Sequence, residues 1–346
     1  MFTVRAARRP GAALALTSPW VAWAVARLTG AERGFPLVPA MTFTPYAALT
    51  AVVPCGVALR AGSRAGALLS GGAGVALAAA VLADRRRPPV TELPDGARLR
   101  VATVSLRLGL VPAGSVLDLV RAKDVDVLSV QELTPEAEER LRAAGLDKLL
   151  PHAVVIPAGP GRVPAASGAV WSRLPLRPAG AVPGGFEQPT VLIDGGGGPD
   201  VELTAVHLMP PASSADLVRA WTAGLAALPG PVAGVLRVLT GDFNASMNHA
   251  AFRAVLARGY RDAAREVGRA MVWTWAPLRP RFPRLAIDHV LVDPRIGVAA
   301  VDVVAVPGSD HRSVVAELVL PSADVLARSV PAPGSDVHGP TSLGTG

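Results

Sequence analysis

The chain has 346 residues, half of them hydrophobic, with a mean hydropathy of +0.38 and a single cysteine, Cys55. This composition excludes a disulfide scaffold, because the cysteine has no second cysteine to pair with, and it excludes intrinsic disorder as the main state. The net charge of +7 lies entirely in residues 1–98, because basic and acidic side chains cancel in the rest of the chain. The excess of basic residues is therefore confined to the N-terminal part of the chain.

Three apolar stretches in that part, residues 12–28, 36–59 and 66–83, lack acidic residues and are bracketed by arginines. The second stretch would be about 36 Å long as a helix, which exceeds a hydrocarbon core of about 30 Å. We predict a membrane region of about three transmembrane helices over residues 1–84, and hence a multi-pass protein of the cell membrane. A signal peptide for the first stretch and buried helices of a soluble protein are the alternatives. Arginine counts are equal on the two sides and do not orient the helices.

Residues 85–98 are rich in Pro and Gly and predict a linker. From residue 99 short apolar runs alternate with helical spacing, which predicts a mixed α/β domain over residues 99–321. Residues 322–346 predict a disordered tail. The expected strands are residues 99–104, 125–130, 169–171, 201–206, 235–239, 286–292 and 314–320, and the expected helices are residues 115–123, 135–149 and 213–228.

Polar residues at the ends of these strands, or breaking their pattern, are candidate site residues. Each one alone has a structural explanation, such as a cap, a core histidine or a turn. Together, in this order on this strand framework, they predict one shared site. They are Gln131 and Glu132, His207, Asp242 and Asn244, Asp288 and His289, and Asp310 and His311.

The combination resembles the endonuclease/exonuclease/phosphatase superfamily over roughly residues 99–320. The most specific element is the pairing of residues 240–244 (TGDFN) with residues 309–311 (SDH). With its apolar N-terminal stretches, the chain is most similar to membrane-anchored bacterial members such as teicoplanin-resistance proteins, whose enzymatic domain faces outward. The resemblance implies an α/β (α+β) fold, a four-layer sandwich of two packed sheets, with an extracytoplasmic catalytic domain that hydrolyses phosphoesters.

The resemblance also implies a divalent cation, Mg2+ or Mn2+, because such an ion neutralises the charge of a phosphate under attack. Glu132 would be the principal metal ligand. Asp310 would be a second ligand or the partner of His311. Asp242 would orient and deprotonate the attacking water.

The same resemblance assigns the remaining residues to the phosphoryl group. Asn244 and His311 would donate to its oxygens, and Asp288 would hold His311 in the right tautomer. His207 would stabilise or protonate the leaving oxygen. One position departs from the family: its first strand normally ends in Asn, and Ser105 stands there in this chain. Glu187 is a weak candidate for a further catalytic carboxylate.

The neutral catalytic domain favours a lipid-linked phosphate or pyrophosphate as substrate, or another small phosphate. Nucleic-acid binding needs a basic footprint, whereas anchoring to the bilayer raises the effective concentration of a membrane-borne substrate. A membrane-anchored nuclease is the alternative, with a local basic cluster at Arg279, Arg281 and Arg284. A second alternative is a non-catalytic scaffold in which Ser105 marks lost activity. Trp273 and Trp275 would form either an apolar wall near the site or ordinary core.

Overall fold

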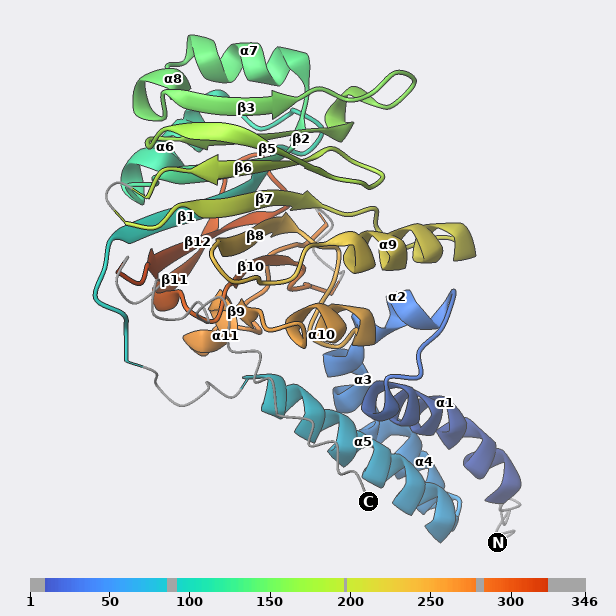
Figure 1. Cartoon of the computed structure of the whole chain (residues 1–346). Helices are drawn as coiled ribbons and strands as arrows, with labels where there is room; N and C mark the ends of the chain where they lie inside the picture. Colours follow the sequence, from blue (N-terminus) through green and yellow to red (C-terminus); the bar gives the residue numbers. More distant parts are fainter. Residues whose placement is uncertain (1–9, 86–91, 196–197, 278–282, 323–346) are drawn as a thin grey trace, which may run out of the picture.

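A computed structural model describes residues 10–85, 92–195, 198–277 and 283–322, and places two six-stranded sheets face to face with helices outside them (Figure 1). The predicted four-layer sandwich of two packed sheets is thereby confirmed. Residues 86–91 of the predicted linker, nearly all of the predicted tail, and the two arginines Arg279 and Arg281 lie outside the described residues.

The first sheet has the strand order β11-β12-β1-β2-β4-β3, in which β1 runs parallel to β2 and antiparallel to β12. Its outer face is covered by α6, α7 and α8. The helix predicted over residues 135–149 is broken into α7 and α8, because Gly145 adopts a left-handed φ of 97°. The elements are β1 Arg98–Ser105, α6 Ala113–Ala122, β2 Val127–Leu133, α7 Pro135–Ala143, α8 Leu146–Leu149, β3 His152–Ile156, the 3-10 turn Pro164–Ala166, β4 Ser167–Ser172, β11 Gly297–Ala305 and β12 Arg312–Val319.

The second sheet repeats this plan with the order β5-β6-β7-β8-β10-β9, in which β7 runs parallel to β8 and β10 antiparallel to β8. Helices α9 and α10 cover its outer face. The elements are β5 Leu176–Val182, β6 Gln188–Ile193, β7 Val201–His207, α9 Ala215–Ala227, β8 Leu236–Asp242, α10 Ala250–Leu256, β9 Arg261–Asp262, α11 Ala263–Glu266 and β10 Asp288–Val292.

The core between the sheets is made of aliphatic side chains that alternate along the central strands. Val101 and Val127 from the first sheet share one buried cluster with Leu203, Val238 and Val290 from the second. Each such side chain contributes about 1.5–3 kcal/mol when it leaves water. This packing brings together, at one edge of the sandwich, the carboxyl ends of the parallel strands β1, β2, β7 and β8. The first residues of β10 and β12 lie at the same edge.

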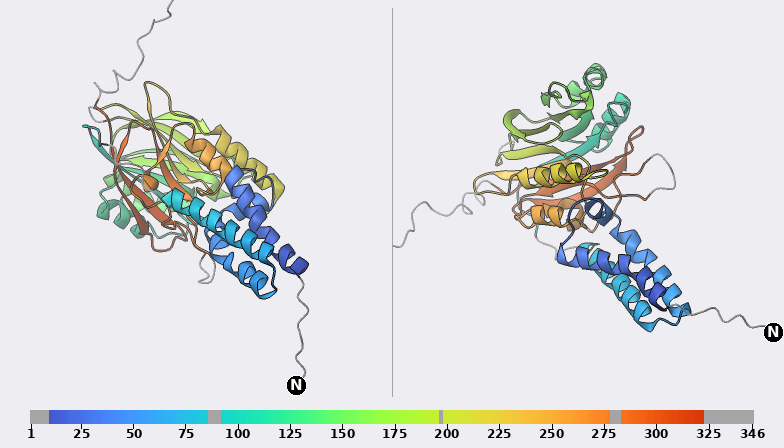
Figure 2. Two further views of the ribbon diagram at one scale, coloured as in Figure 1. Left: turned by 90° about the horizontal axis from the view of Figure 1, so that it is seen from below. Right: turned by 90° about the vertical axis from the view of Figure 1, so that its right-hand side faces the viewer.

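The N-terminal region forms a helical bundle that projects from the sandwich (Figures 1 and 2). Among the described residues, α5 is the helix long and apolar enough to cross a membrane. The second predicted span differs from the structure, since residues 36–59 are divided among short helices. Pro45 lies in the first turn of α3. Proline disfavours helical geometry in the residue before it, so a preceding helix is expected to end before Pro45. The helices are α1 Pro10–Thr29, α2 Leu37–Met41, α3 Thr44–Thr50, α4 Val52–Arg60 and α5 Arg64–Arg85.

Polar contacts attach this bundle to the sandwich. The Arg27 Nη2 atom lies 2.7 Å from Asp84 Oδ2, which joins α1 to α5, and its Nε donates to Asn248 Oδ1 at 3.2 Å. The Glu32 carboxylate accepts from the backbone N–H of Ala250, in the first turn of α10. Arg27 is buried and joined to both α5 and the sandwich.

Candidate functional site

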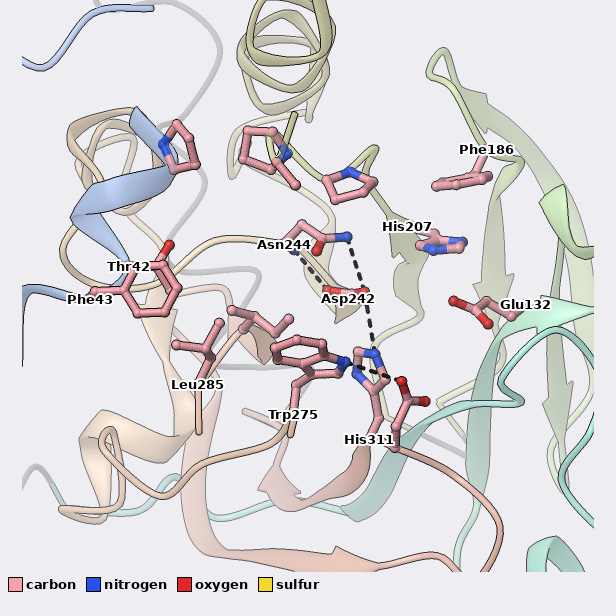
Figure 3. A pocket seen from close by; sticks show the side chains of 16 residues that line it. Thr42, Phe43, Glu132, Phe186, His207, Asp242, Asn244, Trp275, Leu285 and His311 are labelled. Atoms are coloured by element: carbon pink, nitrogen blue, oxygen red, sulfur yellow. Dashed lines mark hydrogen bonds and ion pairs between the residues drawn. The ribbon is translucent and has the colours of Figure 1, made fainter. Parts of the chain in front are cut away.

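A cavity of about 450 Å³ lies at the edge of the sandwich where the parallel strands end (Figure 3). Seven of the predicted site residues gather at this one place, although they come from distant parts of the chain. Asp288 stands behind His311 and does not line the cavity itself, and Gln131 and His289 do not line it either. The predicted residues that line it are Glu132, His207, Asp242, Asn244, Asp310 and His311.

Unusual backbone geometry presents three of these groups. Glu132 has a φ of 55° and lies where the pairing of β2 with β4 shifts register, and Asn244 has a φ of 46°. Such left-handed residues cost of order 1–3 kcal/mol each and cluster at functional sites. Gly241 has a φ of 145°, and a Cβ there would lie 2.0 Å from the carbonyl oxygen of Val206. Only glycine therefore lets β8 bring Asp242 close against β7.

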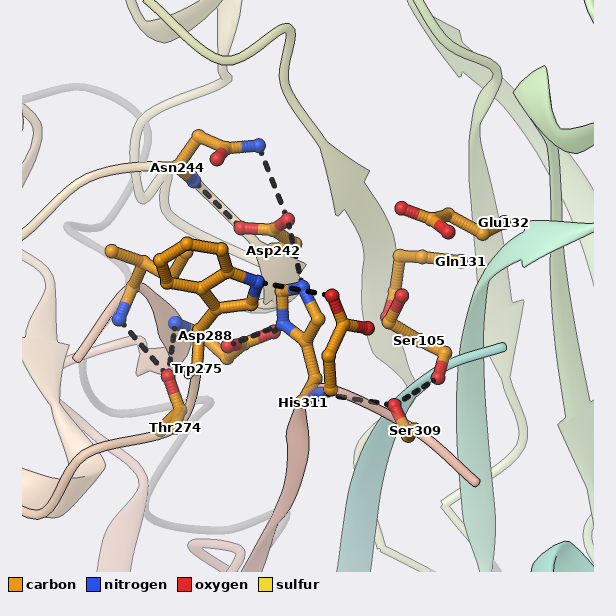
Figure 4. A network of polar contacts seen from close by, with 12 residues as sticks. Ser105, Gln131, Glu132, Asp242, Asn244, Thr274, Trp275, Asp288, Ser309 and His311 are labelled. Carbon is orange, nitrogen blue, oxygen red and sulfur yellow. Dashed lines mark hydrogen bonds and ion pairs between the residues drawn. The ribbon is translucent and has the colours of Figure 1, made fainter. Parts of the chain in front are cut away.

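His311 is held between two carboxylates (Figure 4). Both Asp288 oxygens lie 3.0 Å from His311 Nδ1, and His311 Nε2 lies 4.0 Å from Asp242 Oδ2. Burial alone would lower the pKa of His311, but the charge and hydrogen bonds of Asp288 outweigh it and raise that pKa to about 10. The ring is therefore a charged donor at neutral pH. The Thr274 and Ser309 hydroxyls fix the pair by accepting from the backbone N–H groups of Asp288 and His311.

Asp242 is fixed by the residue two positions after it. One Asp242 oxygen accepts from the Asn244 backbone N–H at 2.8 Å, and the other accepts from Asn244 Nδ2 at 3.1 Å. Burial and the neighbouring Asp288 raise the pKa of Asp242, which suits a group that takes a proton from water near neutral pH. Asn244 Nδ2 also donates to the Leu208 carbonyl at 2.8 Å, so both of its N–H groups are engaged within the protein.

His207 forms an uncharged part of the wall. Its ring stacks on Phe186 with centroids 3.9 Å apart, and burial lowers its pKa to about 3. The charge of His311 adds to this effect. His207 is therefore neutral at physiological pH, where an imidazole offers one donor and one acceptor. Its Nδ1 atom is buried and bonds to no polar atom of the described residues.

Two carboxylates of the cavity have the chemistry of a divalent-cation site. Glu132 Oε2 accepts from the Leu108 N–H at 2.5 Å, and Asp310 Oδ2 accepts from Trp275 Nε1 at 3.2 Å. Each contact orients a carboxylate that faces the cavity, and carboxylate oxygens are the ligands that Mg2+ and Mn2+ prefer. Potential ligand atoms of Asp242, Asp288 and His311 also lie within 4.8 Å of one another. The residues present therefore fit a divalent cation.

Other residues that the sequence drew attention to lie elsewhere. His289 belongs to the core, where its ring bonds to Asp262 Oδ2 at 2.6 Å and to the Ala245 carbonyl at 2.9 Å. Glu187 does not line the cavity and lies 3.7 Å from Arg162.

The two candidate tryptophans have different places. Trp275 lines the cavity, as an apolar wall would require. Trp273 does not; its ring lies between the guanidinium groups of Arg284 and Arg312.

The sequence did not predict several parts of the cavity wall, including Phe186 and the N-terminal residues that line it. Phe186 follows two glycines in a loop, and Pro39, Thr42 and Phe43 belong to the N-terminal region. The other site residues were predicted because each is a polar residue at the end of a strand. The segments that carry Phe186 and the N-terminal residues have no such feature. Nothing local in the sequence places them beside Asp242.

Comparison with known proteins gives a family and a fold. The model of the Endonuclease/Exonuclease/phosphatase family matches residues 106–311. No curated protein matches the chain in sequence. The narrower resemblance to teicoplanin-resistance proteins stays a prediction.

The chain is similar to three solved structures, of which the first two share its fold. D. rerio TDP2 complexed with single-strand DNA product is 15% identical with a TM-score of 0.50, over 64% of this chain and 99% of that one. A functionally unknown conserved protein from Enterococcus faecalis V583 is 16% identical with a TM-score of 0.50, over the same shares. An endonuclease/exonuclease/phosphatase from Beutenbergia cavernae DSM 12333 is 22% identical with a TM-score of 0.49, over 65% of this chain and 72% of that one.

Proposed function

The chain belongs to the endonuclease/exonuclease/phosphatase family, and from that premise we propose that it is a membrane-anchored, divalent-metal-dependent hydrolase of a lipid-linked phosphate or pyrophosphate. Members of this family are phosphoester hydrolases. The observation that carries the proposal is the cavity, where Glu132, Asp242 and His311 face one space together with other polar groups and with several apolar side chains.

The residues would divide the reaction as follows. A divalent cation held by Glu132 and Asp310 would supply neutralisation of the phosphoryl charge. Asp242 orients the attacking water and takes its proton. His311, held by Asp288, donates to a phosphoryl oxygen, and neutral His207 donates to the leaving oxygen. Acid–base groups of this kind contribute about 10²–10⁴-fold each to the rate.

The lining of the cavity supports a small or lipid-linked phosphate over a nucleic acid. Of the described residues that line it, none is lysine or arginine. Nucleic-acid binding gains most of its affinity from such cations on the phosphate backbone. The lining includes instead the apolar residues Phe43, Pro210, Pro211, Leu285 and Ile287.

The outer surface of the helical bundle supports membrane anchoring. Leu49, Leu68 and Val75 are 72%, 77% and 71% exposed, which is unusual for so many large apolar side chains in one region. At about 1.5 Å per residue, α5 is about 33 Å long, enough to cross the hydrocarbon core. We place the catalytic domain on the extracytoplasmic side of the plasma membrane on the family resemblance alone.

A phosphate-release screen tests the proposal. Wild type, Asp242→Asn and the surface control Asp118→Asn are assayed with Mg2+ on polyprenyl phosphates and diphosphates, phospholipids, nucleotides and plasmid DNA. We expect release from a lipid-linked phosphate that Asp242→Asn lowers about 10²–10⁴-fold and that Asp118→Asn, on an 81% exposed side chain, leaves unchanged. Rapid cleavage of DNA with no release from lipids would favour the nuclease.

Calorimetric titration with Mg2+ separates the enzyme from a non-catalytic scaffold. We expect a binding heat in the wild type that Glu132→Gln abolishes, because Glu132 presents a carboxylate to the cavity. A titration without any heat that depends on Glu132 would favour the scaffold.

A further inference from the structure

One wall of the catalytic cavity comes from the N-terminal helical region. Pro39 in α2, and Thr42 and Phe43 directly after it, line the same space as Asp242 and His311. We infer that these three residues, the α2 wall, select a substrate that carries an apolar chain next to its phosphate. The inference rests on the proposed hydrolase function and assigns a specificity role within it to a part of the chain outside the matched family domain.

The α2 wall is fixed to the catalytic domain by buried contacts. Met41 is fully buried, and Val38 packs in the cluster that contains Trp221. Buried His249 joins the two parts, since its Nε2 lies 3.1 Å from the Val38 carbonyl oxygen and 3.1 Å from Thr42 Oγ1. A segment held in this way keeps its side chains in one place, as a specificity element requires.

The cavity has a polar end and an apolar end. Figure 3 shows Phe43 and Leu285 on the side opposite Glu132, with Asp242 and His311 between them. A ligand with a phosphate at one end and an aliphatic chain at the other matches this arrangement, because the charged end meets hydrogen-bonding groups and the chain meets apolar walls.

The apolar side of the cavity adjoins the helical bundle. Phe43 is followed at once by α3, and its ring lies 6.5 Å from that of Tyr46. The Tyr46 hydroxyl accepts from the Arg284 backbone N–H at 2.9 Å and donates to the Arg284 carbonyl at 3.0 Å, which fixes α3 to the segment that leads into β10. The Phe43 side of the cavity is therefore held in place on both sides of α2.

Variants of Phe43 in the full-length protein test the inference. Farnesyl diphosphate and ethyl diphosphate share one phosphoanhydride bond and differ in chain length. We expect Phe43→Ala to lower the farnesyl-to-ethyl ratio of kcat/KM about tenfold, since loss of apolar pocket contacts changes discrimination by about that amount. Phe43→Leu keeps an apolar side chain and should retain most of the ratio. Phe35→Ala removes an exposed phenylalanine outside the cavity and should leave the ratio unchanged.

Binding of a non-hydrolysable farnesyl phosphonate, measured by calorimetry on the same variants, gives a readout that does not need turnover. An unchanged ratio and unchanged phosphonate affinity in Phe43→Ala would overturn the inference, as would an equal loss for both substrates. A wild type that hydrolyses neither diphosphate, yet binds the phosphonate through Phe43, would overturn the proposed hydrolysis but would still support selection of an apolar chain by the α2 wall.

Discussion

Ser105 ends β1 where the family resemblance implies an asparagine. Its hydroxyl is buried and bonds to no polar atom of the described residues, whereas its backbone carbonyl accepts from Ser309 Oγ at 2.8 Å. The contact that ties β1 to the loop before His311 thus uses the main chain, and the side chain at this position is free to differ.

The variant Ser105→Ala should therefore have almost no effect on stability or on phosphate release. Its carbonyl contact persists and no partner loses a bond, so we expect stability to change by less than about 1 kcal/mol. The Mg2+ dependence of phosphate release should be unchanged. Ser309→Ala is the matched variant, because it removes a hydroxyl that bonds to both Ser105 and His311 and should lower the rate. A large loss of activity in Ser105→Ala would instead give its hydroxyl a part in the reaction.

The end of β8 depends on one glycine. Gly241 has a backbone conformation that residues with side chains rarely adopt, and the Val206 carbonyl occupies the space where a Cβ would go. The residue after it, Asp242, then pairs in register with His207 on β7 and with Asp288 on β10. One glycine near the end of β8 thus aligns three site residues from three strands.

Replacing this glycine should damage both fold and site. We expect Gly241→Ala to destabilise the protein by at least about 3 kcal/mol, because both the backbone conformation and the clash oppose it. Gly114→Ala is the control, since a Cβ there meets nothing within 4 Å, and it should change stability by less than about 1 kcal/mol. Thermal unfolding measures both. Equal melting temperatures for the two variants would contradict this account of Gly241.

The attachment of α2 should depend on pH through His249. Its Nδ1 accepts from the Ser246 N–H at 2.9 Å, so the proton resides on Nε2 and faces Val38. Burial lowers the pKa of His249 to about 4, against about 6.5 in an unfolded chain. Between these values the unfolded state binds a proton that the folded state does not. Stability therefore falls by on the order of 3 kcal/mol as the pH drops through this window, and levels off below it.

The comparison of wild type with His249→Gln isolates this effect, because glutamine does not titrate. We expect wild type to be the more stable at pH 7 and its advantage to shrink at pH 4.5, as followed by thermal unfolding in detergent. An advantage that grows on acidification would show that the ring is charged when folded.

The polar half of the site could be predicted from sequence, and the α2 wall could not. Glu132, His207 and Asp242 each follow a buried apolar run, so each marks a strand end, and strand ends meet at one edge of a sheet. His249 and Val38 are joined across more than 200 positions by a contact that no local pattern encodes. The break between α7 and α8 was missed for a different reason, since Gly145 was compatible with a continuing helix until its φ was known.

The arrangement of the bundle and the sandwich suggests how the protein would lie relative to a bilayer. The bundle exposes apolar side chains to its surroundings, and Pro39, Thr42 and Phe43 of the same N-terminal region line the cavity. An anchored enzyme of this shape would hold its reactive groups close to the bilayer surface, where lipid phosphates are concentrated.

Two charges in α5 should abolish the membrane association proposed above. Lysine at the centre of a span costs about 2.5–3.5 kcal/mol, and Val75 lies at the centre of α5, so Val75→Lys combined with Leu68→Lys should prevent sedimentation with phospholipid vesicles. The control pair, Val163→Lys with Val232→Lys, alters exposed side chains of the catalytic domain and should sediment like wild type. Retention of the α5 variant on vesicles would contradict insertion of this helix.

The sharing of one cavity between the N-terminal helices and the catalytic domain has a practical consequence. A fragment that starts after residue 98 would lack Pro39, Thr42 and Phe43, and the patch beside Trp221 that Val38 covers would open to water. Substrate surveys with such a truncated enzyme would rank long-chain ligands too low. Fusing this fragment to an unrelated membrane anchor would place it at the membrane but would not restore its selectivity for long-chain ligands.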